Sequence, residues 1–334
     1  MFFLLAVVIS LAAILPPVLG TRGATCNATT PCSSDYPCCS EYGFCGNGYY
    51  CLGGCDPISS HSLNSCKPNP ICHSANYTLS DTSRILSNYT YFNDWVVQQG
   101  SIFNATSDGE PAIALTLTEN NGGTLLSSTR YVHYGRITAR LKTGRWAGVV
   151  TAFITMSSLK DEIDWEFPGN ATTEGQTNYF WQGVIPQTTN GVTETGLSDT
   201  YSNWHDFTVG IYLRVSLTGN LDTLTFLVDG NVTRTVKASD CVNNATGVTE
   251  YPNTPSRIQL SLWPAGISTE PQGTIQWAGG MINWNDPDYV SAVQCNDTTP
   301  MNSSVTSYVY GPNVTLDTPV HRIFQRDYAY QQRR

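Results

Sequence analysis

The chain has 334 residues, of which 13% are charged and 11% aromatic, and it carries a net charge of −9 with a pI near 4.9. This length allows one large domain with its own core and a small second unit. The acidic balance argues against nucleic acid as a partner, because a protein that tracks phosphates needs a basic surface. A neutral polysaccharide raises no such conflict.

The chain begins with an apolar run over residues 2–15, which is closed by Pro16, Pro17 and Gly20. Its length and the small residue at its end predict a signal peptide over residues 1–20. The alternative is an uncleaved anchor, for which the run is short. Ten Asn-X-Ser/Thr sequons between Asn27 and Asn313 favour the same compartment. We therefore expect a secreted glycoprotein.

Nine of the eleven cysteines lie between Cys26 and Cys72. In an oxidising compartment this clustering predicts a disulfide framework. Residues 26–72 have no apolar period long enough for a core, so such a small unit needs covalent staples. The alternative is a zinc site, but no Cys-X2-Cys pair is followed by a matching pair. No metal and no cofactor are predicted.

From about residue 75 the chain changes to short runs in which apolar and polar residues alternate. Turn signals separate the runs, for example Asp229-Gly230 between residues 223–228 and 232–236. The other predicted strands cover residues 112–118, 135–142 and 256–263. This rhythm predicts an all-β fold, a β-sandwich or jelly roll, over residues 75–295. The tail, 296–334, is polar and has no hydrophobic end, so no stable membrane anchor is expected.

Three carboxylates, Glu162, Asp164 and Glu166, occur at every second position of one run. In a β-strand they share one face, with neighbours about 6.6–7 Å apart along the strand. Ile163, Trp165 and Phe167 then fill the opposite face. Like charges on one face are costly, and a paired-carboxylate site for cleaving glycosidic bonds would account for them. The alternative is a solvated acidic edge strand.

The segment Cys38-Cys39-Ser40-Glu41-Tyr42-Gly43-Phe44-Cys45-Gly46 resembles a hevein-type chitin-binding module. In that family a serine and three aromatic rings form the sugar platform. By motif position these are Ser40, Tyr42, Phe44 and Tyr50. Flat rings on a stapled loop can stack on the apolar faces of N-acetylglucosamine. Phe44 stands where Trp or Tyr is more usual.

The resemblance also implies a ladder of disulfides: Cys26 with Cys39, Cys32 with Cys45, and Cys38 with Cys51. Cys55, Cys66 and Cys72 then compete for one bond. Cys241 and Cys295 are expected to pair within the larger domain. Sequence alone does not fix this connectivity.

The larger domain resembles glycoside hydrolase family 16, whose signature corresponds here to Glu162-Ile163-Asp164-Trp165-Glu166. More closely, it is similar to the fungal Crh-type cell-wall transglycosylases, which join chitin to β-glucan. Further motifs carry this likeness: Gly135-Arg136-Ile137, Asn178-Tyr179-Phe180, Trp204-His205-Asp206-Phe207, Leu262-Trp263-Pro264-Ala265-Gly266 and Gly273-Thr274-Ile275. The likeness covers roughly residues 26–295.

The resemblance implies a jelly-roll sandwich with a concave cleft and a retaining double displacement. Position by position, Glu162 is the nucleophile and Glu166 the general acid/base. Asp164 lies between them, and its charge is expected to help keep Glu166 protonated. Further substrate-binding candidates are Gln259, Trp263, Thr274, Asn178 and His205. The histidine could equally be a satisfied core residue.

Together with the signal peptide, these resemblances imply a secreted, fungal cell-wall glycosidase and transglycosylase that cuts chitin and transfers the fragment to β-glucan or chitin. Its expected partners are these two polysaccharides. Two rivals remain: a plain β-glucan hydrolase, and a chitin-binding lectin with a silent catalytic domain. The intact carboxylate array argues against the lectin. No residue pattern separates hydrolase from transferase.

Overall fold

The computed structural model describes ten stretches of the chain: residues 23–77, 79, 85–87, 93–108, 110–212, 215–216, 219–220, 222–285, 305–310 and 321–325. The predicted signal peptide and most of the polar tail lie outside them. No helix in the described part is long and apolar enough to cross a membrane.

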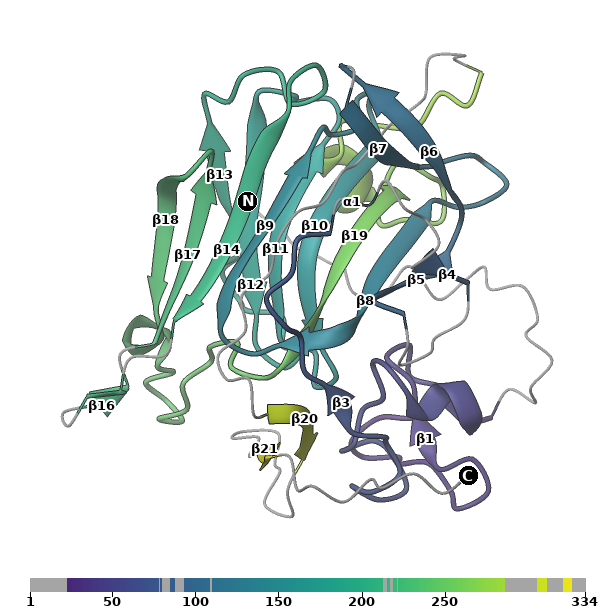
Figure 1. Ribbon diagram of the computed structural model, residues 1–334, viewed down its shortest axis with the longest axis vertical. Coiled ribbons are helices and arrows are strands. Elements are labelled where there is room, and N and C mark those ends of the chain that lie inside the picture. Colours follow the sequence, from purple (N-terminus) through teal and green to yellow (C-terminus); the bar gives the residue numbers. More distant parts are fainter. Residues whose placement is uncertain are drawn as a thin grey trace.

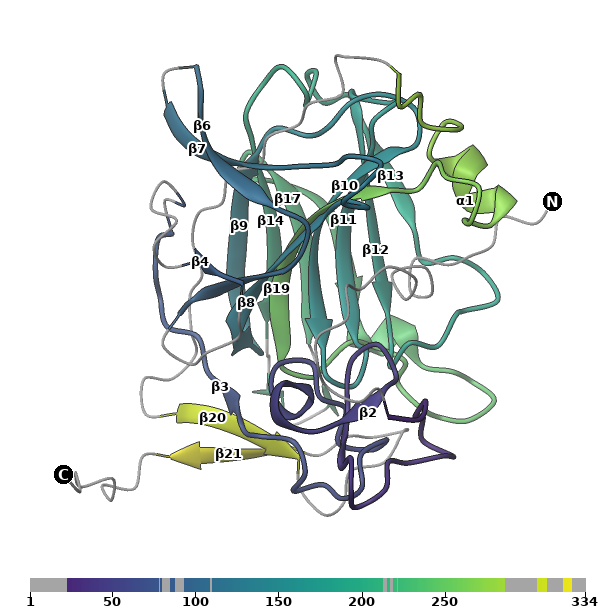
Figure 2. The same cartoon turned by 90° about the vertical axis from the view of Figure 1, so that its right-hand side faces the viewer.

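Two antiparallel sheets stack face to face (Figure 1; Figure 2). The larger sheet has eight strands, of which only the pair β4 and β5 is parallel. In spatial order these are β13 (Val192–Thr195), β12 (Glu174–Phe180), β11 (Glu162–Pro168), β10 (Val149–Ser157), β19 (Ser256–Pro264), β8 (Thr124–Val132), β5 (Trp95–Gln99) and β4 (Ile85–Leu86). The smaller sheet runs β18 (Asn231–Lys237), β17 (Thr223–Val228), β14 (His205–Tyr212) and β9 (Gly135–Leu141).

Shorter elements surround the two sheets. They are the pairs β1 (Cys38–Cys39) with β2 (Cys45–Gly46), β6 (Ile102–Ser107) with β7 (Glu110–Leu115), and β15 (Val215–Ser216) with β16 (Gly219–Asn220), the ladder β21 (His321–Gln325), β20 (Val305–Tyr310) and β3 (Asn69–Pro70), and the helix α1 (Gln272–Trp277). Two 3₁₀ turns cover Gly48–Cys51 and Ala238–Cys241. The architecture confirms the predicted all-β jelly roll.

The predicted hairpin at Asp229-Gly230 joins β17 to β18. Both residues have positive φ, 49° and 81°, as a tight hairpin turn with a right-handed twist requires. The predicted strands at 135–142 and 256–263 correspond to β9 and β19. The run at 112–118 forms the end of β7 and the residues after it.

Four disulfides cross-link the cysteine-rich segment, residues 26–72. Three of them, Cys26–Cys39, Cys32–Cys45 and Cys38–Cys51, are the ladder that the resemblance implies. The fourth joins Cys55 to Cys66. Cys72 is therefore the unpaired cysteine of this segment, and it is buried.

The prediction for Cys241 differs from the structure, in which this residue carries a free thiol. Its Sγ lies 3.4 Å from the Lys237 carbonyl oxygen and 3.4 Å from the hydroxyl of Tyr179. The 3₁₀ turn after β18 therefore directs the thiol toward β12. The expected partner, Cys295, lies outside the described residues.

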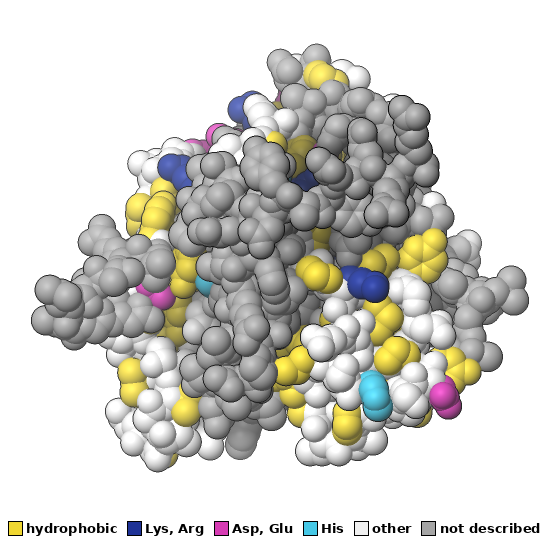
Figure 3. All heavy atoms as spheres, turned by 60° about the horizontal axis from the view of Figure 1, so that its bottom comes forward, with side chains coloured by type: hydrophobic (Ala, Val, Ile, Leu, Met, Phe, Trp, Pro, Cys, Tyr) yellow, Lys and Arg dark blue, Asp and Glu magenta, His cyan; other side chains and the backbone are white. Residues whose placement is uncertain are grey.

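The cysteine-rich segment packs against one end of the larger sheet (Figure 1; Figure 2). Tyr131 of β8 is fully buried at this contact. Its hydroxyl accepts a hydrogen bond from the Gly54 N–H at 2.8 Å, and its carbonyl accepts one from the Cys72 N–H at 3.0 Å. Seen from this end, the described surface shows few charged side chains among hydrophobic and neutral ones (Figure 3).

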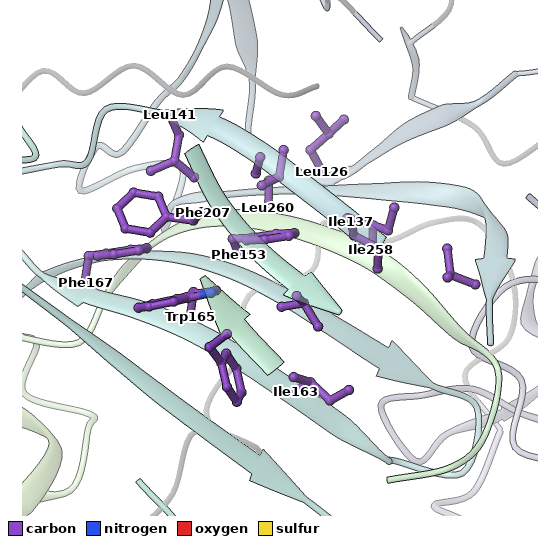
Figure 4. Close-up of a cluster of buried hydrophobic side chains, with 14 of the residues drawn as sticks. Leu126, Ile137, Leu141, Phe153, Ile163, Trp165, Phe167, Phe207, Ile258 and Leu260 are labelled. Atoms are coloured by element: carbon purple, nitrogen blue, oxygen red, sulfur yellow. The ribbon is translucent and has the colours of Figure 1, made fainter. Parts of the chain in front are cut away.

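The core lies between the two sheets, where alternate residues of β11 point toward β14 and β17 (Figure 4). The Trp165 ring stacks on Phe167 with centroids 5.9 Å apart and contacts Phe207 at 5.3 Å. Its indole N–H donates to the Thr208 carbonyl oxygen of β14 at 3.2 Å. This apolar side of β11 fixes its other side, with the carboxylates, on the opposite face of the sheet.

Candidate active site

The three carboxylates of β11 lie on the face of the larger sheet that points away from the core. Glu162 and Asp164 are each 1% exposed and Glu166 is 5% exposed. β11 pairs with β10 on one side and β12 on the other. It is therefore an interior strand with buried acids, and the alternative of a solvated edge strand is wrong.

The cross-strand neighbours of these acids are mainly apolar on the β10 side. Met156 lies opposite Glu162, Ile154 opposite Asp164, and Ala152 opposite Glu166. On the β12 side the neighbours are Phe180, Asn178 and Gln176, in the same order. None of these direct cross-strand neighbours is a Lys or an Arg, so burial works against ionisation of the carboxylates.

Burial raises the pKa of all three acids. Desolvation raises that of Glu162 to about 7. Desolvation first, and then the charge of Glu162, raises the pKa of Glu166 to about 8. Glu162 thus ionises before Glu166 as the pH rises. Two acids of one site with different pKa values are suited to an acid/base role and a nucleophilic role.

The effect of Asp164 differs from the prediction, which had its charge act on Glu166. Desolvation first, and then the charges of Glu162 and Glu166, raise the pKa of Asp164 well above the ordinary value. It shares a hydrogen bond with Glu162, and this bond lowers the pKa of Glu162. Asp164 therefore acts on Glu162, and the charge that raises the pKa of Glu166 comes from Glu162.

A pocket opens over this face of the sheet. Both glutamates line it, together with the predicted Gln259 and Trp263 of β19. Other lining residues are Gln99, Gly122, Leu125, Ala152, Ile154, Met156, Ser157, Ser158, Lys160, Ser261, Pro264, Ile267, Thr269 and Glu270. Two more, Glu41 and Tyr42, come from the cysteine-rich segment. The cleft is thus built from segments that are far apart in the sequence.

The remaining predicted substrate-binding residues lie elsewhere. Asn178 sits beside Asp164 on the same sheet face, outside the pocket lining. Thr274 is 3% exposed within α1 and also does not line the pocket. His205 is on β14 of the smaller sheet, where its Nδ1 lies 2.7 Å from the Asp229 carboxylate and its Nε2 lies 2.8 Å from the Ser198 hydroxyl. Its assignment to the cleft is therefore wrong.

The motifs missed several residues that the structure brings to the site. The Trp277 indole N–H donates to Oε1 of Gln176, the neighbour of Glu166, at 2.8 Å. The Trp277 ring also stacks on Trp263 with centroids 6.1 Å apart. Strand parity in β12 could have placed Gln176 on the cleft face, since it alternates with Asn178. No local signal pointed to Glu41.

A jelly roll with paired, buried glutamates on an interior strand of its cleft sheet has the architecture of a glycoside hydrolase. The model of the family described as "Glycosyl hydrolases family 16" matches residues 92–279. This match covers more than half of the chain, which therefore belongs to that family.

Curated relatives agree with this assignment. "Crh-like protein 3" of Botryotinia fuckeliana is 44% identical over 248 residues, which cover 72% of this chain and 52% of that protein. "Crh-like protein 2" of Aspergillus fumigatus is 40% identical over 293 residues (82% and 63%). "Congo red hypersensitive protein 2" of Saccharomyces cerevisiae is 41% identical over 287 residues (84% and 59%). The chain thus spans between half and two thirds of the length of these relatives.

The chain is also similar to solved structures. "Crh5 transglycosylase in complex with NAG" shares 25% identity, with a TM-score of 0.58, and the match covers 77% of this chain and 94% of that one.

Proposed function

We propose that this chain is a retaining glycosidase and transglycosylase of the fungal cell wall, which cleaves chitin and transfers the cleaved fragment to β-glucan or chitin. The observation that carries the proposal is the pair Glu162 and Glu166, which line one cleft with pKa values raised to about 7 and about 8. In addition, Oε1 of Glu166 is buried and has no hydrogen-bond partner among the described residues. A buried, unpartnered carboxyl oxygen is suited to meet a substrate atom.

The proposed reaction has two steps: a covalent glycosyl-enzyme intermediate forms in the first and is broken down in the second. Glu166, still protonated, gives its proton to the leaving glycosidic oxygen while the ionised Glu162 attacks the anomeric carbon. Glu166 then removes the proton of an acceptor hydroxyl, which attacks the glycosyl-enzyme and releases Glu162. A sugar acceptor gives transfer, and water gives hydrolysis.

The proposed substrates agree with the chemistry of the cleft. Its lining combines aromatic and aliphatic side chains with Gln259 and Ser261, and such mixed linings bind neutral ligands that have both apolar faces and hydroxyl groups. The similarity to Crh-like proteins and the cysteine-rich segment favour chitin as the donor. Secretion through the predicted signal peptide belongs to the same proposal.

The decisive assay mixes the purified protein with chitin oligosaccharides and a fluorescent laminari-oligosaccharide, beside a Glu162→Gln control. We expect a labelled product of higher mass with the wild type only. Shortened chains without labelled hybrids would instead indicate a hydrolase. Unchanged sugars with chitin still bound would indicate a lectin.

The hydrogen bond from Asp164 predicts a shift in pH dependence. Because this bond lowers the pKa of Glu162, Asp164→Ala should let that pKa rise. Less Glu162 is then ionised at any pH below the new value, so the acidic limb of the kcat/KM profile should move to higher pH.

Asp164→Asn is the matched control, since its amide N–H can still donate to Glu162. Its acidic limb should move less than that of Asp164→Ala. Superimposable acidic limbs for wild type and Asp164→Ala would show that this hydrogen bond does not tune the nucleophile.

A further inference from the structure

A tight turn of the cysteine-rich segment reaches the catalytic cleft. The Ser40 and Phe44 backbones close this turn, with Ser40 N–H donating to the Phe44 carbonyl oxygen at 3.0 Å and Gly43 N–H donating to the Ser40 carbonyl oxygen at 2.9 Å. Gly43 has a φ of +75°, a conformation that glycine adopts without strain. The turn projects Glu41 and Tyr42, and both line the pocket that holds the catalytic pair.

Glu41 fixes the turn to the larger sheet, on β19 and β5. Its Oε2 lies 2.5 Å from Nη2 of Arg257, and its Oε1 accepts a hydrogen bond from the Gln98 side chain at 2.6 Å. Arg257 is fully buried on β19, and it and Glu162 stand on opposite sides of the same β10 residue, Met156. A buried guanidinium requires a counter-charge, and the carboxylate that supplies it is 216 residues away in the sequence.

A second contact packs closely behind this ion pair. Gly54 has a φ of +81°, and a Cβ placed on it would lie 2.8 Å from Oε2 of Glu41 and 2.9 Å from Nη2 of Arg257. Its N–H is the one that donates to the Tyr131 hydroxyl. The segment thus contacts the sheet through backbone, an ion pair and close packing, which together define one orientation.

Tyr42 is placed differently from its neighbours in the segment. Of the four predicted platform residues, Ser40, Tyr42, Phe44 and Tyr50, only Tyr42 lines the catalytic pocket. Tyr49, by contrast, is 60% exposed and does not line it. Burial and the charge of Glu41 raise the pKa of Tyr42 well above the ordinary value.

Trp263 lies at the other end of the same pocket. It is six residues along β19 from Arg257, the residue that forms the ion pair with Glu41. At about 3.3 Å per residue, this spacing is roughly 20 Å along the strand. The two glutamates therefore lie in a pocket that has an aromatic ring toward each end.

We propose that the cysteine-rich segment forms an end wall of the catalytic cleft, with Tyr42 as a substrate-contacting residue of that cleft and Glu41 as the residue that positions it through Arg257. The proposal rests on the proposed function for the sugar that enters the cleft. It differs from the usual picture of a binding module that only tethers the enzyme to insoluble polymer. One sugar chain would contact the segment and the catalytic glutamates at the same time.

The test uses the full chain and short soluble donors, chitotetraose and chitohexaose, with laminari-oligosaccharide as acceptor. Tyr42→Ala should raise KM for the soluble donor about tenfold, which corresponds to about 1.4 kcal/mol. Tyr49→Ala, the exposed control on the same segment, should leave KM unchanged. An unchanged KM for Tyr42→Ala, with loss of retention on insoluble chitin only, would overturn the proposal.

A second outcome would also overturn it. If Tyr42→Ala lowered KM or raised kcat/KM, the turn would obstruct the cleft instead of contributing to it. Binding of chitohexaose to Glu162→Gln, by calorimetry, provides a readout that does not depend on turnover. Adding Tyr42→Ala to that variant should weaken binding by a similar factor. If neither donor is turned over, the proposed function fails, while a Tyr42-dependent affinity would still support the cleft wall.

Glu41 is tested as a positioning residue by a double-mutant cycle. Glu41→Ala should raise KM in the same direction as Tyr42→Ala. The double variant should then lose less than the sum of the two changes, because Tyr42 is already misplaced without its anchor. Glu41→Gln, which keeps the contact with Gln98 but loses the charge, should fall between Glu41→Ala and wild type. Strictly additive effects would show that the ion pair does not position the tyrosine.

Discussion

Glu162→Gln should lower turnover of oligosaccharide donors by roughly 10³-fold or more, because no covalent intermediate can form without the carboxylate. The amide has nearly the same shape, so the strand should remain intact and the protein should still be retained on chitin beads. Loss of retention together with activity would mean that the substitution disrupted the fold.

Glu166→Gln should also lower turnover, but the size of this loss should depend on the leaving group of the substrate. General acid/base catalysis contributes about 10²–10⁴-fold, and a substrate with a good leaving group, such as a dinitrophenyl glycoside, does not need the proton. With such a substrate Glu166→Gln should recover a burst of the first step, whereas Glu162→Gln should not. Asp206→Asn, on β14 of the other sheet, is the carboxylate control. Recovery in Glu162→Gln would reverse the two assignments.

Trp165→Ala should produce the largest loss of stability among single changes in β11. The ring is 0% exposed and contacts Phe167, Phe207 and Phe226. Its removal leaves a cavity that costs about 3–5 kcal/mol in the free energy of unfolding. For a domain of this size, that corresponds to a fall in Tm of about 10 °C.

Differential scanning fluorimetry checks this expectation. Trp165→Phe should lower Tm less than Trp165→Ala does, because it keeps most of the ring volume. It still loses some stability, since it gives up the hydrogen bond to the Thr208 carbonyl oxygen. Phe103→Ala, at a side chain that is 47% exposed on β6, should change Tm by only a degree or two. A shift for Trp165→Ala as small as that of Phe103→Ala would contradict the placement of Trp165 in the core.

Strand parity gave the most accurate information on the site. The alternation of Glu162, Asp164 and Glu166 with Ile163 and Trp165 is a local property of the chain. It decides which side chains share a face, whatever the sheet around them. The same holds for the hairpin at Asp229-Gly230, because the positive φ values required there depend on only two residues.

Strand parity does not predict which sheet a strand belongs to. His205 alternates correctly with Phe207, but both lie on β14 of the smaller sheet, across the core from the sheet that carries the cleft. Thr274 sits near the cleft motifs in sequence, yet α1 buries it. Strand parity also does not predict how the carboxylates affect one another's pKa values. The hydrogen bond between Asp164 and Glu162 depends on side-chain directions, and the pKa values depend on the desolvation around them.

The sequence by itself thus determined the all-β class, the strand face that carries the three carboxylates, and the cysteine spacing that corresponds to the observed disulfide ladder. Each of these follows from short-range geometry: the two-residue period of a strand, the φ values of a turn, the spacing of a stapled loop. Only the tertiary structure decided that Glu41 pairs with Arg257 and that Tyr42 lines the cleft. A contact across 216 residues depends on how separately formed surfaces pack, and no local pattern encodes that packing.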